Sequence, residues 1–380
     1  MIMEEQLFID FCRERNLSPG SVDVYRHALK KYVTYNNMTL QELLDEADQE
    51  EEQRIRWKQR TLKHHLIDFR NHLINEGYAK ETISGIMRRV LTFYRHHEIE
   101  IHHLPRVNIQ SVVEIRLPTR DDLQAAIDSS KPLMKAIILF LATTGMSKVD
   151  MLKLTIDDFI TATGPYHNTN NINEAMNILK DTSNVVPTFA LTRTKTNKFH
   201  YTFCTPEAVT SIVNYLYSRK DKLTPESPLF KVSYQHLTIK FEHLNEALNL
   251  GVTMGNSYAV LRCHTLRKYH ATTLRDDGLS IDIINSLQGK TKNKVDRAYY
   301  VDTPEKLKEM YMDHMNSLAI GDEYRFRTKM ETITEENKTL KQREEEINNR
   351  ISLIEEKLFE IDKKGNSRED ILEHFGEKLQ

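Results

Sequence analysis

The sequence predicts a mainly α-helical protein with a small β-sheet, arranged as two domains and a helical tail. Apolar residues recur at helical spacing along most of the 380-residue chain. Two short runs, 186–195 and 199–204, have the composition of strands that turn at Thr196 and Asn197. We therefore expect four parts: a helical N-terminal domain over 1–105, a linker over 106–118, a mixed α+β domain over 119–320, and a coiled-coil tail over 321–380.

The N-terminal domain is predicted to contain several amphipathic helices. The S-P-G-S run at 18–21 indicates a turn and a cap, and the residues after it are apolar at helical spacing. Two further helical patterns lie within 62–74 and 82–94. The acidic segment 41–53 fits either an exposed loop or a helix with a solvated face. Residues 102–118 include two prolines and little periodicity, which indicates an interdomain linker.

The second domain is expected to begin at Thr119, which caps a helix over 122–129. An apolar helix around 137–142 should end at Thr144 and Gly145, and the asparagine-rich segment 168–173 should be a loop. After the two strands, helices are expected from Pro206 to about Met315.

The tail carries a heptad pattern typical of a coiled coil. Apolar residues follow one another at intervals of seven, and Asn337 and Glu344 interrupt the matching second position. A single amphipathic helix folded against the rest of the protein is the alternative. We favour self-association or partner pairing through the residues of the first position, which are Phe326, Ile333, Leu340, Ile347, Ile354 and Ile361.

Composition excludes several classes of protein. The longest purely apolar run, 136–142, has seven residues and is too short to span a bilayer, so we expect no membrane association. The three cysteines form neither a disulfide framework nor a zinc pattern, which favours the reducing cytoplasm. The net charge is −2, yet basic residues outnumber acidic ones over 186–320. Charge therefore permits nucleic-acid binding without requiring it.

The most informative motif is H-T-L-R-K-Y-H over 264–270. Because residues three apart are neighbours on a helix, His264 and Arg267 should share a face. The guanidinium offers a fork of donors suited to phosphate, and the imidazole can exchange a proton. Tyr299 or Tyr300 downstream supplies a possible nucleophile. Together these residues indicate covalent chemistry on a phosphodiester.

Each of these residues has an ordinary structural interpretation when taken alone. His264 can cap a helix, Arg267 can pair with an acid, and Lys195 can be a solvated turn residue. Their order along the chain instead favours one function for all of them, which is covalent chemistry on a phosphodiester.

That order resembles the tyrosine recombinases, also called phage integrases. The resemblance covers about residues 5–315 and is strongest over 186–203 and 264–272. The segment from Gln288 through Leu307 is most similar to the archaeal branch. The resemblance implies a helical core-binding domain, a mixed catalytic domain, and a tyrosine that forms a 3′-phosphotyrosine and frees a 5′-hydroxyl. The reaction passes through a pentacoordinate phosphorane, whose charge fixed cations can stabilise without a metal. We therefore expect no metal and no cofactor.

The family roles are carried over to matching positions of this sequence. Arg267 should hold a nonbridging oxygen, His264 begins the H-x-x-R pair, and Lys195 in R-T-K-T should be the general acid. Lys268 follows the arginine where the family has histidine or lysine. Lys290 follows Gly289, where histidine or tryptophan is usual. Tyr299, nine residues beyond Lys290, is the predicted nucleophile, with Tyr300 as its rival.

The chain departs from the family at the first catalytic arginine. That arginine stands two residues past the T-G dipeptide, where this chain has Ser147 followed by Lys148. Lysine is a point charge and cannot supply a bidentate fork. Three outcomes stay open: Lys148 as the substitute, a slow enzyme, or loss of cleavage with DNA binding retained. We favour a working enzyme.

The predicted function is site-specific DNA recombination or integration for a mobile element, with double-stranded DNA bound by a homotetramer. The alternative is a catalytically impaired DNA-binding relic that regulates or competes at recombination sites, and a helical scaffold ranks last. Adjacent histidine pairs point in different directions on a helix, so they predict no metal site. Five basic residues are candidates for phosphate contacts along one helix, with a solvated face as the alternative: Arg54, Arg56, Lys58, Arg60 and Lys63.

Overall fold

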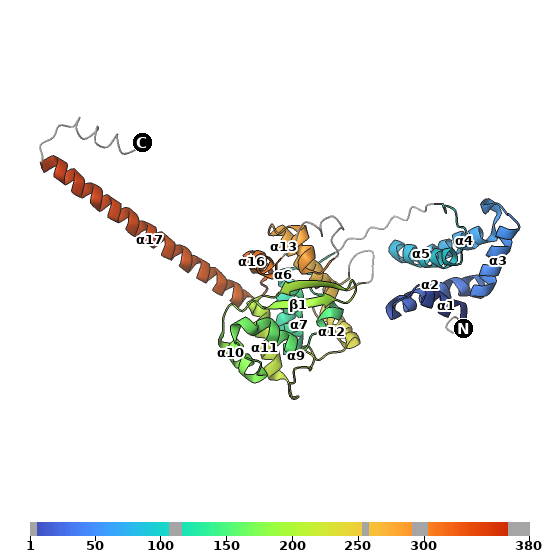
Figure 1. The fold of residues 1–380 in the computed structure, drawn as a ribbon, viewed down its shortest axis with the longest axis horizontal. Helices are drawn as coiled ribbons and strands as arrows, with labels where there is room; N and C mark the ends of the chain where they lie inside the picture. Colours follow the sequence, from blue (N-terminus) through green and yellow to red (C-terminus); the bar gives the residue numbers. More distant parts are fainter. Residues whose placement is uncertain (1–5, 106–115, 253–257, 291–302, 364–380) are drawn as a thin grey trace. The chain divides into compact units, whose positions relative to one another are not determined.

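The computed structural model describes residues 6–105, 116–252, 258–290 and 303–363. It divides into two compact units that meet in the sequence between Arg116 and Leu117. The predicted fold class is confirmed, because the described residues are mostly helical and include one two-stranded antiparallel sheet (Figure 1). No helix among the described residues has the length and apolar character needed to cross a membrane.

The first unit is a helical domain with its own core. Buried leucines and aromatic rings from these helices pack together, with Tyr32, Phe69, Phe93 and Tyr94 at the centre. Helix α2 contacts α4 and α5, while α3 contacts α1 and α4. The elements are α1 (Gln6–Glu14), α2 (Pro19–Asn36), α3 (Leu40–Glu52), η2 (Trp57–Gln59), α4 (Thr61–Asn75) and α5 (Lys80–His96).

The acidic segment 41–53 is helical rather than a loop. Thr39 and Glu42 form a capping box at the start of α3, and Leu43, Leu44 and Ala47 are buried. Glu50 is also buried, where its carboxylate accepts hydrogen bonds from the first backbone N–H groups of α4. The acidic segment is thus a helix with one buried face.

The prediction that five basic residues lie along one helix is wrong. Arg54 has a left-handed φ of 54° just after α3, and Lys58 lies in the separate 3₁₀ turn η2. Arg60 precedes α4 and is buried, where it pairs with Glu51 and donates to the carbonyl of Ile55 at 3.0 Å. No glycine or proline marks the break, so the sequence offered little sign of it.

The second unit is built around the apolar helix α7 (Pro132–Thr144). Every residue from Ala136 to Thr144 is buried, because α7 contacts α6 (Arg120–Asp128), α11 (Pro206–Ser218) and α13 (Cys263–Asp276). A helix that is apolar on all sides requires such complete enclosure. Helix α7 ends at Gly145, whose left-handed φ is 61°, as predicted. The other helical elements before the tail are α8 (Lys148–Met151), α9 (Ile156–Thr163), η3 (Gly164–Tyr166), α10 (Ile172–Asp181), α12 (Tyr234–Ala247), α14 (Ile281–Leu287), α16 (Pro304–His314) and η4 (Met315–Leu318).

The predicted hairpin is present, with a shorter first strand and a second strand of the predicted length that begins one residue earlier. Strand β1 (Thr188–Arg193) pairs with β2 (Lys198–Phe203) in antiparallel register, from Thr188 opposite Phe203 to Arg193 opposite Lys198. The carbonyl of Arg193 accepts the N–H groups of Thr196 and Asn197, at 3.3 and 2.9 Å, and so ends the ladder. Residues 194–197 therefore form the turn, and Lys195 lies within it.

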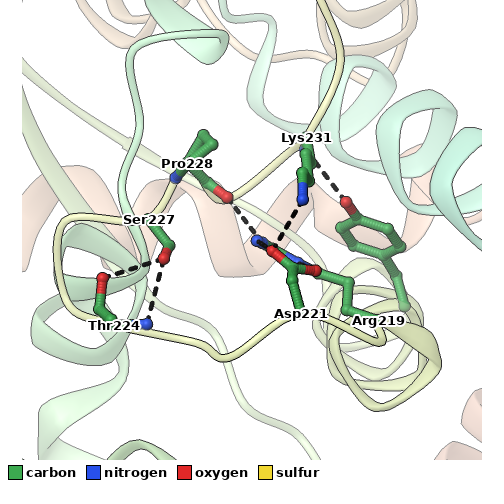
Figure 2. A network of polar contacts seen from close by, with 7 residues as sticks. Arg219, Asp221, Thr224, Ser227, Pro228 and Lys231 are labelled. Carbon is green, nitrogen blue, oxygen red and sulfur yellow. Dashed lines mark hydrogen bonds and ion pairs between the residues drawn. The ribbon is translucent and has the colours of Figure 1, made fainter.

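An ion-paired loop leads from α11 into α12. Figure 2 shows Arg219 facing Asp221, with N···O distances of 3.1 and 2.7 Å, and donating to the carbonyl of Pro228. Lys231 adds a second cation at 3.1 Å from the same carboxylate. Hydrogen bonds from Arg219 and Lys231 hold the pKa of Asp221 well below its usual range. The network fixes the chain before α12.

The tail is helical over α17 (Asp322–Lys363). The described side chains on its heptad line are exposed, including those of Ile333, Leu340, Ile347 and Ile354. The side chains of Phe326 and Ile361 lie outside the described part.

Candidate active site

The candidate site lies within the second unit, where side chains meet the ends of two helices. The last carbonyls of α7 each accept a side-chain donor: Tyr311 binds that of Thr143, Thr202 binds that of Thr144, and Arg267 binds that of Gly145. Carbonyls at a helix C-terminus have no partner within the helix, so such donors hold the end in place.

Arg267 joins this end of α7 to the end of α14. Its side chain is buried, with Nη1 at 2.6 Å from the Gly145 carbonyl and Nη2 at 2.7 Å from the Gln288 carbonyl. Burial lowers the pKa of Arg267 to about 10, and the charge of Arg193 adds to this effect. A guanidinium fixed by two backbone carbonyls keeps further N–H groups for another ligand.

Two more cations bind the carbonyls that follow. Arg193 Nη1 donates to the Gly289 carbonyl at 3.2 Å, and Lys198 Nζ donates to the Lys290 carbonyl at 2.8 Å. Residues 288, 289 and 290 thus present successive carbonyls to Arg267, Arg193 and Lys198. We call Arg193, Arg267 and Lys290 the cationic cluster.

The members of this cluster repel one another. Burial lowers the pKa of Lys290, and the charges of Arg267 and Arg193 lower it further. Asp150 faces the cluster as a counter-charge: burial raises its pKa, but hydrogen bonds from Ser147 and Thr194 and the charge of Arg193 outweigh burial. One carboxylate against several cations leaves a positive potential that favours an anion.

Three histidines line the cluster. His264 is exposed on α13, and its pKa is lowered by partial burial and by the charges of Lys268, Arg262, Arg267 and Lys290. His270, one turn past Arg267, is completely buried, and burial lowers its pKa to about 3. Its Nδ1 lies 3.1 Å from Gln288 Nε2, so His270 is a neutral acceptor there.

His200 on β2 is the third. Burial lowers its pKa, with the charges of Arg267 and Lys198 adding to the effect and that of Asp150 opposing it. Its ring packs against Gly289, where a Cβ would come within 2.7 Å of Nδ1. Buried nitrogen atoms of His200 and His270 have no hydrogen-bond partner among the described residues.

The structure brings some of the predicted site residues together. His264, Arg267, Lys268 and Lys290 are close enough for their charges to act on one another. Lys195 is exposed in the hairpin turn, two residues past Arg193, and no hydrogen bond or ion pair engages it among the described residues. Tyr299 and Tyr300 lie outside the described residues.

Lys148 is engaged elsewhere. Its amine donates to Thr238 Oγ1 and lies 3.4 Å from the centre of the Tyr234 ring, both on α12. Ser147 caps α8 and donates to Asp150 Oδ2 at 2.6 Å. Lys148 therefore adds no cation beside Arg267 in this arrangement, and Ser147 is uncharged.

Several residues of the site were not predicted from the sequence. Arg193 was part of the R-T-K-T motif, and His270 part of the H-T-L-R-K-Y-H motif, but neither received a role. Asp150, Lys198 and His200 had no recognisable signal, because their partners in the site lie 44 to 92 residues away in the sequence. Over the described stretches, no group of three or more His, Cys, Asp or Glu side chains gathers in a way that suits a metal ion.

Comparison with known proteins gives distant structural likenesses. No protein-family model and no curated protein matches the sequence. The fold is similar to that of XerA recombinase, with 18% identity over 81% of this chain and 96% of that chain and a TM-score of 0.34. It is similar to XerH site-specific recombinase bound to palindromic difH substrate, with 15% identity over 80% and 82% of the two chains and a TM-score of 0.49. A lambda integrase dimer bound to a COC′ core site gives 14% identity over 79% of each chain and a TM-score of 0.49. These values are low, so we base the functional proposal on the motifs and the site geometry.

Proposed function

We propose that the protein is a site-specific DNA recombinase or integrase that cuts and rejoins DNA through a 3′-phosphotyrosine intermediate. The observation that carries the proposal is the cationic cluster: Arg193, Arg267 and Lys290 lie near one another in a partly buried place, and burial with the neighbouring positive charges lowers the pKa of Arg267 and of Lys290. A DNA phosphate offers the missing negative charge, and guanidinium groups match its geometry.

The reaction exchanges one phosphodiester bond for another. The phenolic oxygen of Tyr299 attacks phosphorus, the bond from phosphorus to the 5′-oxygen breaks, and a 3′-phosphotyrosine forms. His264 accepts the phenolic proton, since its lowered pKa keeps the imidazole neutral near pH 7. Lys195 donates a proton to the leaving 5′-oxygen. The 5′-hydroxyl of another strand then reverses these steps.

The cations stabilise the charge that develops on the nonbridging oxygens. Arg267 holds one of these oxygens from its fixed position between the Gly145 and Gln288 carbonyls. Lys290 and Lys268 add positive charge nearby. Groups positioned before the reaction need little reorganisation during it, which is why such donors contribute strongly to rate.

A DNA-binding relic is the second candidate function. The observation that favours it is the engagement of Lys148 with Thr238 and Tyr234, which leaves the position after Ser147 without a free cation beside Arg267. A relic would bind recombination sites through the cationic cluster and compete with active enzymes there.

The assembly we propose is a homotetramer on two double-stranded DNA sites, in the cytoplasm, as expected for an archaeal-type recombinase of a mobile element. Helix α17 adds a self-association element through its exposed heptad residues.

Covalent trapping on a nicked DNA duplex tests the enzymatic proposal. A nick just beyond the scissile phosphate lets the short 5′-hydroxyl fragment diffuse away, so the protein stays attached to DNA. We expect an adduct with the natural protein and a loss of ~100-fold or more in its rate with Arg267→Gln. Arg275→Gln is the matched control, since Arg275 lies on the same helix but is exposed and pairs with Asp276.

Two results would oppose parts of this proposal: one opposes the enzymatic activity, and the other opposes the role of Arg267. DNA binding without any adduct favours the relic, and an adduct that forms equally well in Arg267→Gln removes the proposed clamp. Thermal unfolding of Arg267→Gln and Arg267→Lys separates a folding defect from a catalytic one.

A further inference from the structure

Arg193, the last residue of β1, stands beside Arg267 although no family motif gives it a role. Its side chain is partly buried, and Nη1 donates to the Gly289 carbonyl at 3.2 Å. The Nε atom is buried and has no hydrogen-bond partner among the described residues. Nε and Nη2 lie on one edge of the guanidinium, the edge that forms paired hydrogen bonds with phosphate or carboxylate.

Arg193 and Arg267 bind the carbonyls of two consecutive residues. Arg267 binds the carbonyl of Gln288, and Arg193 binds the carbonyl of the next residue, Gly289. Each also acts electrostatically on the other: the charge of Arg193 lowers the pKa of Arg267, after the larger effect of burial. The two guanidinium groups are thus anchored to neighbouring backbone carbonyls and near enough for their charges to interact.

Hydrogen bonds that begin at Ser147 help to position Arg193. Ser147 donates to Asp150 Oδ2 at 2.6 Å, and Asp150 Oδ1 accepts the backbone N–H of Thr194 at 2.9 Å. Asp150 is buried, so this connection fixes the residue directly after Arg193. Where the resembling family has an arginine, this chain has a serine that secures the hairpin from which another arginine extends.

We propose that Arg193 is the second phosphate clamp of the site and replaces the arginine that Ser147 lacks. The proposal rests on the proposed function and names a residue that touches the scissile phosphate. Nε and Nη2 of Arg193 hold one nonbridging oxygen while Arg267 holds the other. Lys148 then keeps its place against Tyr234 and takes no part in catalysis.

A purely structural role predicts a different outcome. Arg193 could act only by tying the hairpin to the Gly289 carbonyl, as Lys198 on the facing strand ties it to the Lys290 carbonyl. Lys198→Gln is therefore a matched control for Arg193→Gln, because each variant removes one cation and one tether to the same loop.

The test measures the rate of covalent adduct formation on two nicked duplexes. One carries an ordinary scissile phosphate, and the other carries a methyl group in place of one nonbridging oxygen, which makes this phosphorus centre neutral. We expect Arg193→Gln to be ~100-fold slower than the natural protein on the phosphate. On the methylphosphonate the deficit should shrink to a few-fold, since no charge is left for the guanidinium to neutralise. Lys198→Gln should show the same small deficit on both.

The outcomes separate the two proposals. An adduct with the natural protein, together with an Arg193→Gln deficit that is absent or equal on both duplexes, overturns the role of Arg193 alone. Absence of any adduct with the natural protein overturns the proposed function, and this inference with it. If Arg193→Gln does not fold, Arg193→Lys replaces it in the same comparison, with a smaller deficit on phosphate expected because lysine keeps the charge but loses the fork.

Discussion

At the scale of single residues, two glycines set how closely the backbone approaches the buried histidines. Gly145 and Gly289 both have a φ of 61°, and a Cβ on either would fall within 2.7 Å of a histidine ring atom. The same two turns present the carbonyls that hold Arg267 and Arg193. Only a residue without a side chain fits both demands.

Gly289→Ala should destabilise the second unit more than an ordinary turn glycine would. A left-handed alanine costs about 1–2 kcal/mol, and the contact with His200 adds about 1–3 kcal/mol of overpacking. Gly251→Ala is the control, since its φ of 73° carries the same backbone cost but no atom lies within 4 Å of its Cβ. Urea unfolding measures both variants. Equal losses would show that the His200 contact is unimportant.

Protonation of His270 should make the second unit less stable in acid. Its pKa is about 3 in the folded protein because burial disfavours the charged form, against about 6.5 in an unfolded chain. Below pH 6.5 the unfolded chain therefore binds a proton that the folded one does not, and stability falls as the pH drops toward 3.

Unfolding free energies between pH 4 and pH 6 measure this effect. The dependence on pH should be shallower in His270→Gln than in the natural protein by up to about 1.4 kcal/mol per pH unit. His236→Gln, at an exposed histidine on α12, should keep the natural slope. An unchanged slope in His270→Gln would mean that the buried imidazole does not control acid stability.

At the scale of elements, the β1–β2 hairpin and the end of α14 act as one unit. Arg193 and Lys198 form the last pair of the ladder, and their side chains reach the carbonyls of Gly289 and Lys290. The chain from residue 291 onward leads to Tyr299. The hairpin that carries Lys195 therefore also fixes the point from which the tyrosine segment starts.

The heptad pattern of helix α17 predicts that this helix pairs with another. The heptad side chains that the structure describes are exposed in a single chain, and pairing of two helices would bury them. Ile347→Asp should shift dissociation to at least ~10-fold higher protein concentration, because it places a charge in the pairing seam.

Leu353→Asp is the matched control for the tail. Ile347 and Leu353 are both 57% exposed, but Leu353 lies off the heptad line. Light scattering over a range of concentrations reports the mass. A natural protein that stays monomeric throughout, or equal effects of the two variants, would remove the case for a coiled coil.

At the scale of the whole molecule, the fold class followed from local signals. Apolar periodicity indicated the helices, Gly145 marked the end of α7, and Thr196 with Asn197 marked the hairpin. These signals act over a few residues and need no knowledge of tertiary contacts. The assumed helix through Arg54 and Arg60 failed because a left-handed residue without glycine gives no such signal.

The candidate site was only partly predictable for the same reason. His264 and Arg267 could be named from their helical spacing, and Lys290 from the resemblance to the family. The roles of Asp150, Arg193 and His200 depend on contacts between segments far apart in the chain, such as the 96 residues between Arg193 and Gly289. The domain limits and the identity of the nucleophile stay predictions.

The most direct test of the central claim is the identity of the residue that becomes linked to DNA. The trapped adduct would be digested with nuclease and trypsin, and cleavage after Arg297 and Lys306 releases residues 298–306, which include Tyr299 and Tyr300. Fragmentation in a mass spectrometer should locate the nucleotide on Tyr299. A protein that binds its DNA but never carries a nucleotide on this peptide would contradict the account.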